Sequence, residues 1–203
     1  MFDESLRTVK NNLMTPMARA VSFLTPTQLS MVGLFIALAM FGALYQGWFL
    51  IGAVLWWLNR IFDGLDGIVA REYDMQSDFG GYLDIMADHV AYIALPVGVI
   101  LGQPFSEFNW LALTFLLATF YANAASWMYL SAVLEKRDRG AKASGETTTV
   151  TMPRGLVAGF ETIVFFSLFA LLPRYAPVLF LVMGAMIIGG MFYRLWWAGQ
   201  NLD

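Results

Sequence analysis

The chain of 203 residues contains no cysteine and only one histidine, His89. Without cysteine there is no disulfide, thiolate metal site or cysteine nucleophile, and one histidine excludes zinc sites built from several. Charged residues are also scarce, at 13% of the chain, whereas a soluble domain has about a quarter. Apolar residues make up 59% and the mean hydropathy is +0.62. This composition predicts a membrane protein.

The apolar residues gather in six segments, each close to the ~20 residues that a helix needs to cross a bilayer. In lipid the backbone must satisfy its own hydrogen bonds, so helices are expected. The fold class we predict is an all-α integral membrane protein with one domain over residues 1–203 and a six-helix transmembrane bundle over 25–203. The expected spans are 27–46, 48–70, 81–102, 109–133, 155–173 and 176–197.

Residues 3–23 have a different, amphipathic pattern. Leu6, Val9, Leu13 and Met17 recur at helical spacing, and basic residues lie between them. The pattern predicts an amphipathic interfacial N-terminal helix within residues 1–24, lying in the headgroup layer. A solvated N-terminal arm is the alternative.

The distribution of Lys and Arg predicts the orientation, because cytoplasmic loops are enriched in both. With six spans, the N-terminal arm, the 71–80 loop, the 134–154 loop and the C-terminus share one side. The only basic residue in the opposite loops is Arg174. Both termini are therefore expected to be cytoplasmic, on the side that holds Arg7, Lys10, Arg19, Arg71, Lys136, Arg137, Arg139, Lys142 and Arg154.

Four aspartates lie at the expected cytoplasmic ends of the second and third spans. Asp63 and Asp66 are three residues apart and Asp84 and Asp88 are four apart, so each pair shares one helix face. Carboxylates within or beside membrane spans are costly and point to function. The two spans are joined by a short loop, so we expect all four carboxylates to meet.

Such a cluster predicts divalent cations, because four anions in a small volume repel one another. Oxygen ligands favour Mg²⁺, Mn²⁺ or Ca²⁺ over zinc or copper. Two ions would balance four carboxylates, and paired metal ions suit in-line displacement at phosphorus. A transporter or channel whose acidic cluster binds cations is the rival interpretation. A transport site is expected near the membrane midplane, whereas this cluster is expected at the cytoplasmic boundary.

The residues around the aspartates favour a phosphate ligand. Gly64, Gly67 and Ala70 leave one helix face bare, and Arg71 lies near the same face. Arginine binds phosphate through two parallel hydrogen bonds. Together the eight fixed positions read Asp63-x2-Asp66-Gly67-x2-Ala70-Arg71-x8-Gly80-x3-Asp84-x3-Asp88.

This string resembles the signature of the CDP-alcohol phosphatidyltransferase family at all eight positions. The six-span layout, the basic N-terminal helix and Thr25-Pro26 before the first span extend the resemblance, although members often have Asn where this chain has Thr27. The resemblance implies a CDP-linked lipid donor such as CDP-diacylglycerol, an alcohol acceptor, release of CMP, Mg²⁺ or Mn²⁺ as cofactor, and a homodimer.

The resemblance also implies roles for individual residues. The metal ligands would be Asp63, Asp66, Asp84 and Asp88, and Asp88 would also be the general base. The CDP-lipid and its CMP portion would be bound by Asp66, Gly67, Ala70, Arg71, Gly80, Thr25 and Pro26.

The acceptor is less well defined by the sequence. Arg137, Arg139, Arg154 and Arg194 are candidates to bind an anionic acceptor, which favours a phosphorylated polyol such as glycerol 3-phosphate or inositol phosphate. Serine or another alcohol with an uncharged headgroup is the alternative, because surplus basic residues also follow from membrane topology. Glu161, expected two turns inside the fifth span, would line the acceptor pocket or pair with a buried group.

Two further residues near the cluster have open roles. Arg60 lies one turn before Asp63 and would neutralise the acidic cluster or act on the substrate. His89 follows Asp88 but points about 100° away on a helix with 3.6 residues per turn, which favours a packing or interfacial role.

Overall fold

A computed structural model describes residues 14–140, 157 and 159–202 of the chain. These residues form helices and connecting turns, with no strand among them, and residues 14–20 are helical. The principal elements are α2 (Pro26–Tyr45), α3 (Phe49–Glu72), α4 (Asp78–Leu101), α5 (Glu107–Lys136), α7 (Gly159–Leu171), the short 3₁₀ helix η1 (Pro173–Tyr175) and α8 (Ala176–Asn201).

The all-helical class is confirmed for the described residues, and each of the six expected segments overlaps one principal α-helix. Four helical segments are long and apolar enough to cross a membrane, namely α2, α4, α5 and the combined segment Pro173–Asn201. The other two differ from the expectation for separate reasons: α3 has charged residues within its apolar stretch, and α7 has only 13 residues. Most of the expected interfacial helix lies outside the described residues.

Local sequence signals explain where the helices begin and end. Thr25 caps α2 by accepting a hydrogen bond from the Gln28 backbone, while the Gln28 side chain accepts one from the Thr25 backbone. This reciprocal arrangement is a capping box. Ser77 caps α4 through its Oγ, which accepts a hydrogen bond from the Gly80 backbone. Between α2 and α3, Gly47 has a φ of 76°, a conformation that glycine adopts without strain.

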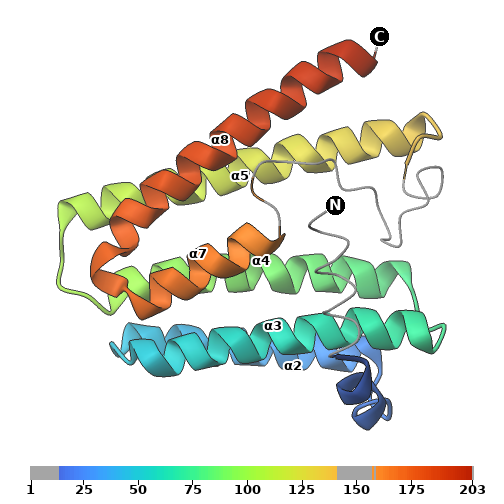
Figure 1. Ribbon diagram of the computed structural model, residues 1–203, viewed down its shortest axis with the longest axis horizontal. Helices are drawn as coiled ribbons and strands as arrows, with labels where there is room; N and C mark the ends of the chain where they lie inside the picture. Colours follow the sequence, from blue (N-terminus) through green and yellow to red (C-terminus); the bar gives the residue numbers. More distant parts are fainter. Residues whose placement is uncertain (1–13, 141–156, 158, 203) are drawn as a thin grey trace.

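The helices form two layers joined by α7 (Figure 1). One layer contains α2, α3 and α4, and α2 packs extensively against both of the others. The second contains α5 and α8, which cross each other, and α7 lies between the layers (Figure 1). Successive helices alternate in direction, so the α3–α4 connection and the C-terminal ends of α5 and α8 lie at one end of the molecule.

An aromatic cluster joins the two layers. Its centre is Phe166 of α7, whose ring centroid lies 5.0 Å from that of Trp56 on α3 and 5.3 Å from that of Tyr92 on α4. Phe169, one turn further along α7, lies 4.7 Å from Phe180 of α8. Phe166, Phe169, Phe180 and Trp56 are fully buried. Aromatic pairs at these separations add stability beyond the area that they bury.

Close helix contacts occur at the end of the first layer away from the α3–α4 connection. The buried Leu44 of α2 lies against Gly52 of α3 and against Gly98 of α4. A Cβ atom on Gly98 would lie 2.9 Å from Leu44 Cβ, and one on Gly102 would overlap the Leu44 carbonyl. Glycine therefore allows three helices to meet around one leucine.

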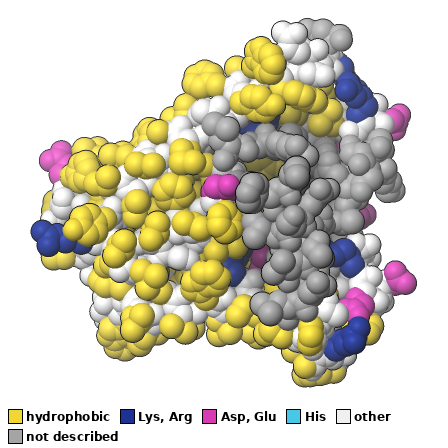
Figure 2. All heavy atoms as spheres, viewed as in Figure 1, with side chains coloured by type: hydrophobic (Ala, Val, Ile, Leu, Met, Phe, Trp, Pro, Cys, Tyr) yellow, Lys and Arg dark blue, Asp and Glu magenta, His cyan; other side chains and the backbone are white. Residues whose placement is uncertain are grey.

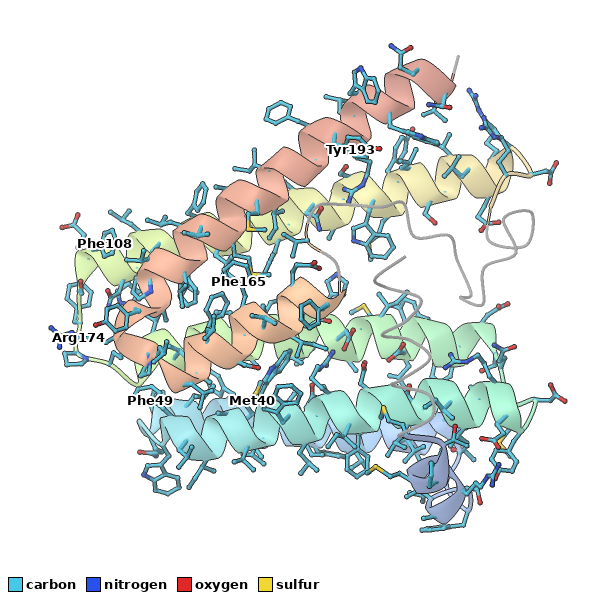
Figure 3. All side chains as sticks on the ribbon, in the orientation of Figure 1. Met40, Phe49, Phe108, Phe165, Arg174 and Tyr193 are labelled. Atoms are coloured by element: carbon cyan, nitrogen blue, oxygen red, sulfur yellow. The ribbon has the colours of Figure 1, made fainter. Side chains whose placement is uncertain are left out.

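The outer surface is largely apolar. Figure 2 shows hydrophobic side chains over most of the described part of the visible face, with scattered Lys, Arg, Asp and Glu side chains. Every helix of the bundle contributes large exposed hydrophobic residues, among them Phe108 and Tyr193, which are labelled in Figure 3. Further examples are Phe35, Leu50, Val54, Ile93, Leu111, Tyr121, Phe160 and Leu195. A membrane accounts for such a surface.

Candidate active site

A pocket between α2, α3 and α4 contains all four aspartates of the signature. Asp63 and Asp66 reach it from successive turns of α3, and Asp84 and Asp88 from successive turns of α4. The expectation that the two pairs meet agrees with this placement. The pocket is lined by Ser30, Gly33, Asn59, Arg60, Asp63, Asp66, Asp84, Ala87 and Asp88.

The carboxylate of Asp66 is anchored to α2. Ser30 Oγ lies 2.6 Å from Asp66 Oδ2 and 3.1 Å from the Pro26 carbonyl. Asp66 is buried, with 4% of its surface exposed. A short hydrogen bond to a carboxylate is stronger than one between neutral groups, so Ser30 fixes one oxygen of Asp66.

Arg60 places a positive charge among the carboxylates. Its Nη2 donates a 2.8 Å hydrogen bond to Asp88 Oδ1, and its Nη1 lies 3.6 Å from Asp63 Oδ2. Arg60 therefore bridges the two helices that supply the aspartates. Tyr92 donates its hydroxyl to the other oxygen of Asp88, Oδ2, at 3.2 Å.

The Arg60 side chain is held from several directions. Its Nε and Nη2 donate to Asn59 Oδ1 at 3.0 and 2.6 Å. Asn59 in turn donates to the Gly33 carbonyl of α2 at 2.8 Å. The guanidinium carbon lies 4.7 Å from the Trp56 ring centroid and 5.2 Å from that of Tyr92, within the range of cation–π attraction. Only 8% of the Arg60 side chain is exposed.

The donor set of the pocket fits a hard divalent cation. Its ligands are carboxylate, hydroxyl and amide oxygens, which Mg²⁺ and Mn²⁺ prefer. Within the described part of the chain, however, no three His, Cys, Asp or Glu side chains converge at metal-binding geometry. Instead, Arg60 lies between Asp63 and Asp88. The chemistry of the ligands therefore fits a metal ion, while two of the four carboxylates, Asp63 and Asp88, are paired with the Arg60 guanidinium.

The residues expected to bind the CMP portion lie beside the pocket. Arg71 lies over Gly67, where a Cβ atom would be 3.1 Å from Arg71 Nη1, so the small residue provides room for the guanidinium. Ala70 lies one turn of α3 from Gly67, and Gly80 lies in the first turn of α4. Thr25 and Pro26 form the beginning of α2, one turn before Ser30.

The candidate acceptor residues are dispersed, and none of the described ones lines the carboxylate pocket. Arg137 and Arg139 are exposed after α5, and Arg139 Nη1 donates to the Asn201 carbonyl at 3.0 Å. Glu161 lies in the first turn of α7, which corrects its expected place two turns inside a span, because residue 157 is still in a bend. Arg154 lies outside the described residues.

Arg194 is buried between α5 and α8. Its Nη1 donates to Asn123 Oδ1 and Ser126 Oγ of α5, both at 3.1 Å. Its Nε has no hydrogen-bond partner among the described residues, and no described carboxylate forms an ion pair with it. Arg194 is thus a buried cation with neutral partners, and 6% of its surface is exposed.

Several pocket residues were not identified from the sequence. Ser30, Gly33 and Asn59 are common residue types with no characteristic spacing, and only the packing of α2 on α3 brings them to the aspartates. Tyr92 lies one turn after Asp88, and this spacing was the available signal. His89 points elsewhere, with its Nδ1 2.7 Å from the Ile85 carbonyl of its own helix.

Comparisons with known proteins agree with this site. The family model for CDP-alcohol phosphatidyltransferase matches residues 23–196. The chain belongs to the CDP-alcohol phosphatidyltransferase family. It is therefore a phosphatidyltransferase of phospholipid synthesis, as the signature around the pocket indicated. The prediction of a transferase is confirmed, and the transporter interpretation is not needed.

Two curated relatives support the same family. This phosphatidyltransferase is 34% identical over 173 residues to the inner membrane protein YnjF of Escherichia coli, covering 85% of this chain and 82% of that protein. Over 80 residues it is 35% identical to the archaetidylinositol phosphate synthase of Pyrococcus horikoshii, covering 39% of this chain and 42% of the synthase. With the apolar helices, the first relative indicates a multi-pass membrane protein.

Solved structures share the fold of this phosphatidyltransferase. The phosphatidylinositol phosphate synthase of Mycobacterium tuberculosis with CDP-DAG bound has a TM-score of 0.68 at 23% identity, covering 91% of this chain and 92% of that one. The same synthase in complex with manganese and citrate has a TM-score of 0.66 at 23% identity, covering 90% and 87%.

Proposed function

We propose that this phosphatidyltransferase moves the phosphatidyl-type group of a CDP-diacylglycerol-like lipid to a phosphorylated polyol and releases CMP. The observation that carries the reaction is the pocket in which Asp63, Asp66, Asp84 and Asp88 meet. These carboxylates, with Mg²⁺ or Mn²⁺ as the proposed cofactor, would hold the donor pyrophosphate. A divalent ion would neutralise the negative charge that develops on the phosphate oxygens.

Asp88 is the residue that we propose as general base. It lines the pocket, and a carboxylate has about four lone-pair positions, of which Arg60 and Tyr92 use two. The remaining lone pairs leave Asp88 able to take the proton from the acceptor hydroxyl. The acceptor oxygen then forms a bond to the lipid-side phosphorus, and the bond from that phosphorus to the CMP oxygen breaks. CMP leaves with the electron pair.

Binding of the CMP portion is assigned to residues beside the aspartates. Arg71, over Gly67, would contact a phosphate, and Ala70 and Gly80 would leave space for the nucleotide. The proposed contacts of Thr25 and Pro26 would come from the beginning of α2. A CDP-diacylglycerol-like donor is consistent with the solved structure of the same fold that contains CDP-DAG.

The acceptor proposal rests on Arg194 and on one relative. Arg194 is a buried cation without a described anionic partner, and a phosphate would neutralise it. The Pyrococcus relative is named for an inositol phosphate product. Arg137, Arg139, Arg154 and Glu161 are further acceptor candidates. Glycerol 3-phosphate and inositol phosphate are the favoured acceptors, and serine or another alcohol with an uncharged headgroup is the alternative.

We extend the proposal to the arrangement in the membrane. Six spans, cytoplasmic termini and a cytoplasmic active site would place the pocket where water-soluble CMP can leave. The charged residues of α3 would then face the pocket, as Arg60, Asp63 and Asp66 do. A homodimer is proposed from the family.

The test is CMP release by purified enzyme with CDP-diacylglycerol, Mg²⁺ or Mn²⁺, and single alcohols: glycerol 3-phosphate, inositol phosphate, serine and glycerol. We expect release with a phosphorylated polyol, abolished by EDTA. Asp88→Ala should lower kcat by about 10²–10⁴-fold, the usual contribution of a general base.

Asp74→Asn is the matched control, because Asp74 is an exposed acidic residue outside the pocket. Its φ is 52°, a conformation that asparagine tolerates. It should retain full activity. Release with serine alone would overturn the acceptor, and release that EDTA does not affect would overturn the metal dependence.

A further inference from the structure

Arg60 is not among the eight fixed positions of the signature, yet it contacts two of the four carboxylates of the site. It bonds Asp88 at 2.8 Å and lies 3.6 Å from Asp63. We propose that Arg60 is a built-in cation that takes the place of a second divalent ion, so that the substrate-free enzyme binds one divalent ion. The inference rests on the proposed metal dependence of the site.

The first argument is that Arg60 is fixed where it lies. Asn59 accepts from two of its nitrogens, and Trp56 and Tyr92 lie within cation–π distance of its guanidinium. Its side chain is 8% exposed. Movement out of the pocket would break these contacts and leave two carboxylates without a counter-charge, which is costly for partly buried groups. A metal ion therefore enters a site that already contains a guanidinium.

The second argument is that Arg60 contacts only some of the four carboxylates. Asp63 and Asp88 are paired with the guanidinium, and both oxygens of Asp88 already accept hydrogen bonds. Asp66 accepts a hydrogen bond from Ser30 through Oδ2. A divalent ion that binds near Asp66 and Asp84 would leave the contacts of Arg60 to Asp88 and Asp63 in place.

The third argument is the charge balance. Four carboxylates and one guanidinium carry a net formal charge of three negative units. One divalent ion would leave the pocket with a net charge of one negative unit. A second ion would make the net charge positive and would lie close to the guanidinium. Like charges at short range in a partly buried site repel strongly. When the donor arrives, its pyrophosphate adds negative charge, and a second ion no longer makes the site positive.

The test counts Mn²⁺ ions bound to purified protein in detergent without CDP-lipid, from the loss of the free Mn²⁺ signal in electron paramagnetic resonance. We expect one ion per chain for the wild type. Arg60→Gln removes the positive charge and should bind two. Tyr92→Phe is the matched control, because it removes a neutral donor to Asp88 and keeps the charge, so its count should stay at one.

Two ions bound to the folded wild type, or one ion bound to folded Arg60→Gln, would overturn the inference and leave the proposed reaction intact. If Arg60→Gln does not fold, the wild-type count decides alone. No Mn²⁺ bound to the wild type, together with CMP release that resists EDTA, would overturn the proposed metal dependence and this inference with it.

Discussion

Two arginines are buried among the described residues, and their surroundings differ. Arg60, in the layer of α2, α3 and α4, lies between two carboxylates, an asparagine and two aromatic rings. Arg194, between α5 and α8, has the neutral partners Asn123 and Ser126 and an Nε without a partner among the described residues. Burying a charge in an apolar helix bundle is costly unless an opposite charge compensates for it.

The comparison shows that the buried cation of one region has anionic partners, whereas the described partners of the other are neutral. In the first, removal of the cation leaves anions uncompensated. In the second, removal of the cation leaves two neutral polar groups. The same substitution should therefore change the stability much more at Arg60 than at Arg194.

The largest effect is expected for Arg60→Met. The substitution keeps much of the side-chain volume between Trp56 and Tyr92 but leaves Asp63 and Asp88 without their counter-charge. Breaking a buried ion pair in this way costs about 3–5 kcal/mol of unfolding free energy. Unfolding in detergent measures the change, and Mg²⁺ should restore part of the loss. An unchanged stability would show that the Arg60 ion pairs contribute nothing.

A smaller loss is expected for Ser30→Ala. It removes the 2.6 Å contact to Asp66, and a hydrogen bond to a charged group contributes about 1.5–3 kcal/mol. Ser167→Ala is the matched control, because its buried hydroxyl donates to the Ile163 carbonyl of the same helix and no charge is involved. The same unfolding assay applies to both. Equal losses for the two serines would contradict a special role for the Ser30–Asp66 contact.

The smallest change in stability is expected for Arg194→Met. Replacing a buried charge that has neutral partners with an apolar side chain is often neutral or stabilising, so we expect a change below about 1 kcal/mol. The KM for a phosphorylated acceptor should rise by on the order of 10-fold or more, because a desolvated ion contact is lost. A loss of stability as large as that of Arg60→Met would remove the contrast between the two regions.

The helices could be predicted from the sequence because apolar runs and turn residues locate them directly. The expected segment 27–46 corresponds to α2 and 176–197 to α8, which continues to Asn201. The expected end of α5 at residue 133 was early, since its last turns are polar and amphipathic and the helix extends to Lys136. Polar residues at a helix end carry no hydropathy signal, so only the capping geometry locates the boundary.

The site was predicted in part. The spacing of the aspartates predicted their helix faces, and the suggestion that Arg60 neutralises the cluster agrees with its ion pairs. The contacts of Ser30, Asn59 and Trp56 could not be predicted, because they depend on how α2 and α7 pack against α3. Residue spacing within one helix contains no information about which face of another helix it meets.

The close packing around Leu44 also has a consequence for how the protein can move. At that end Gly52, Gly98 and Gly102 hold α3 and α4 against α2 with no space for a side chain, whereas the aspartate pocket lies further along the same helices. Helices that are held together at one end can separate most at the other end. We therefore expect the glycine contacts to act as a pivot, so that a small rotation about Leu44 would widen the pocket beside Asp66 and Asp84 while the end with the glycines stays closed.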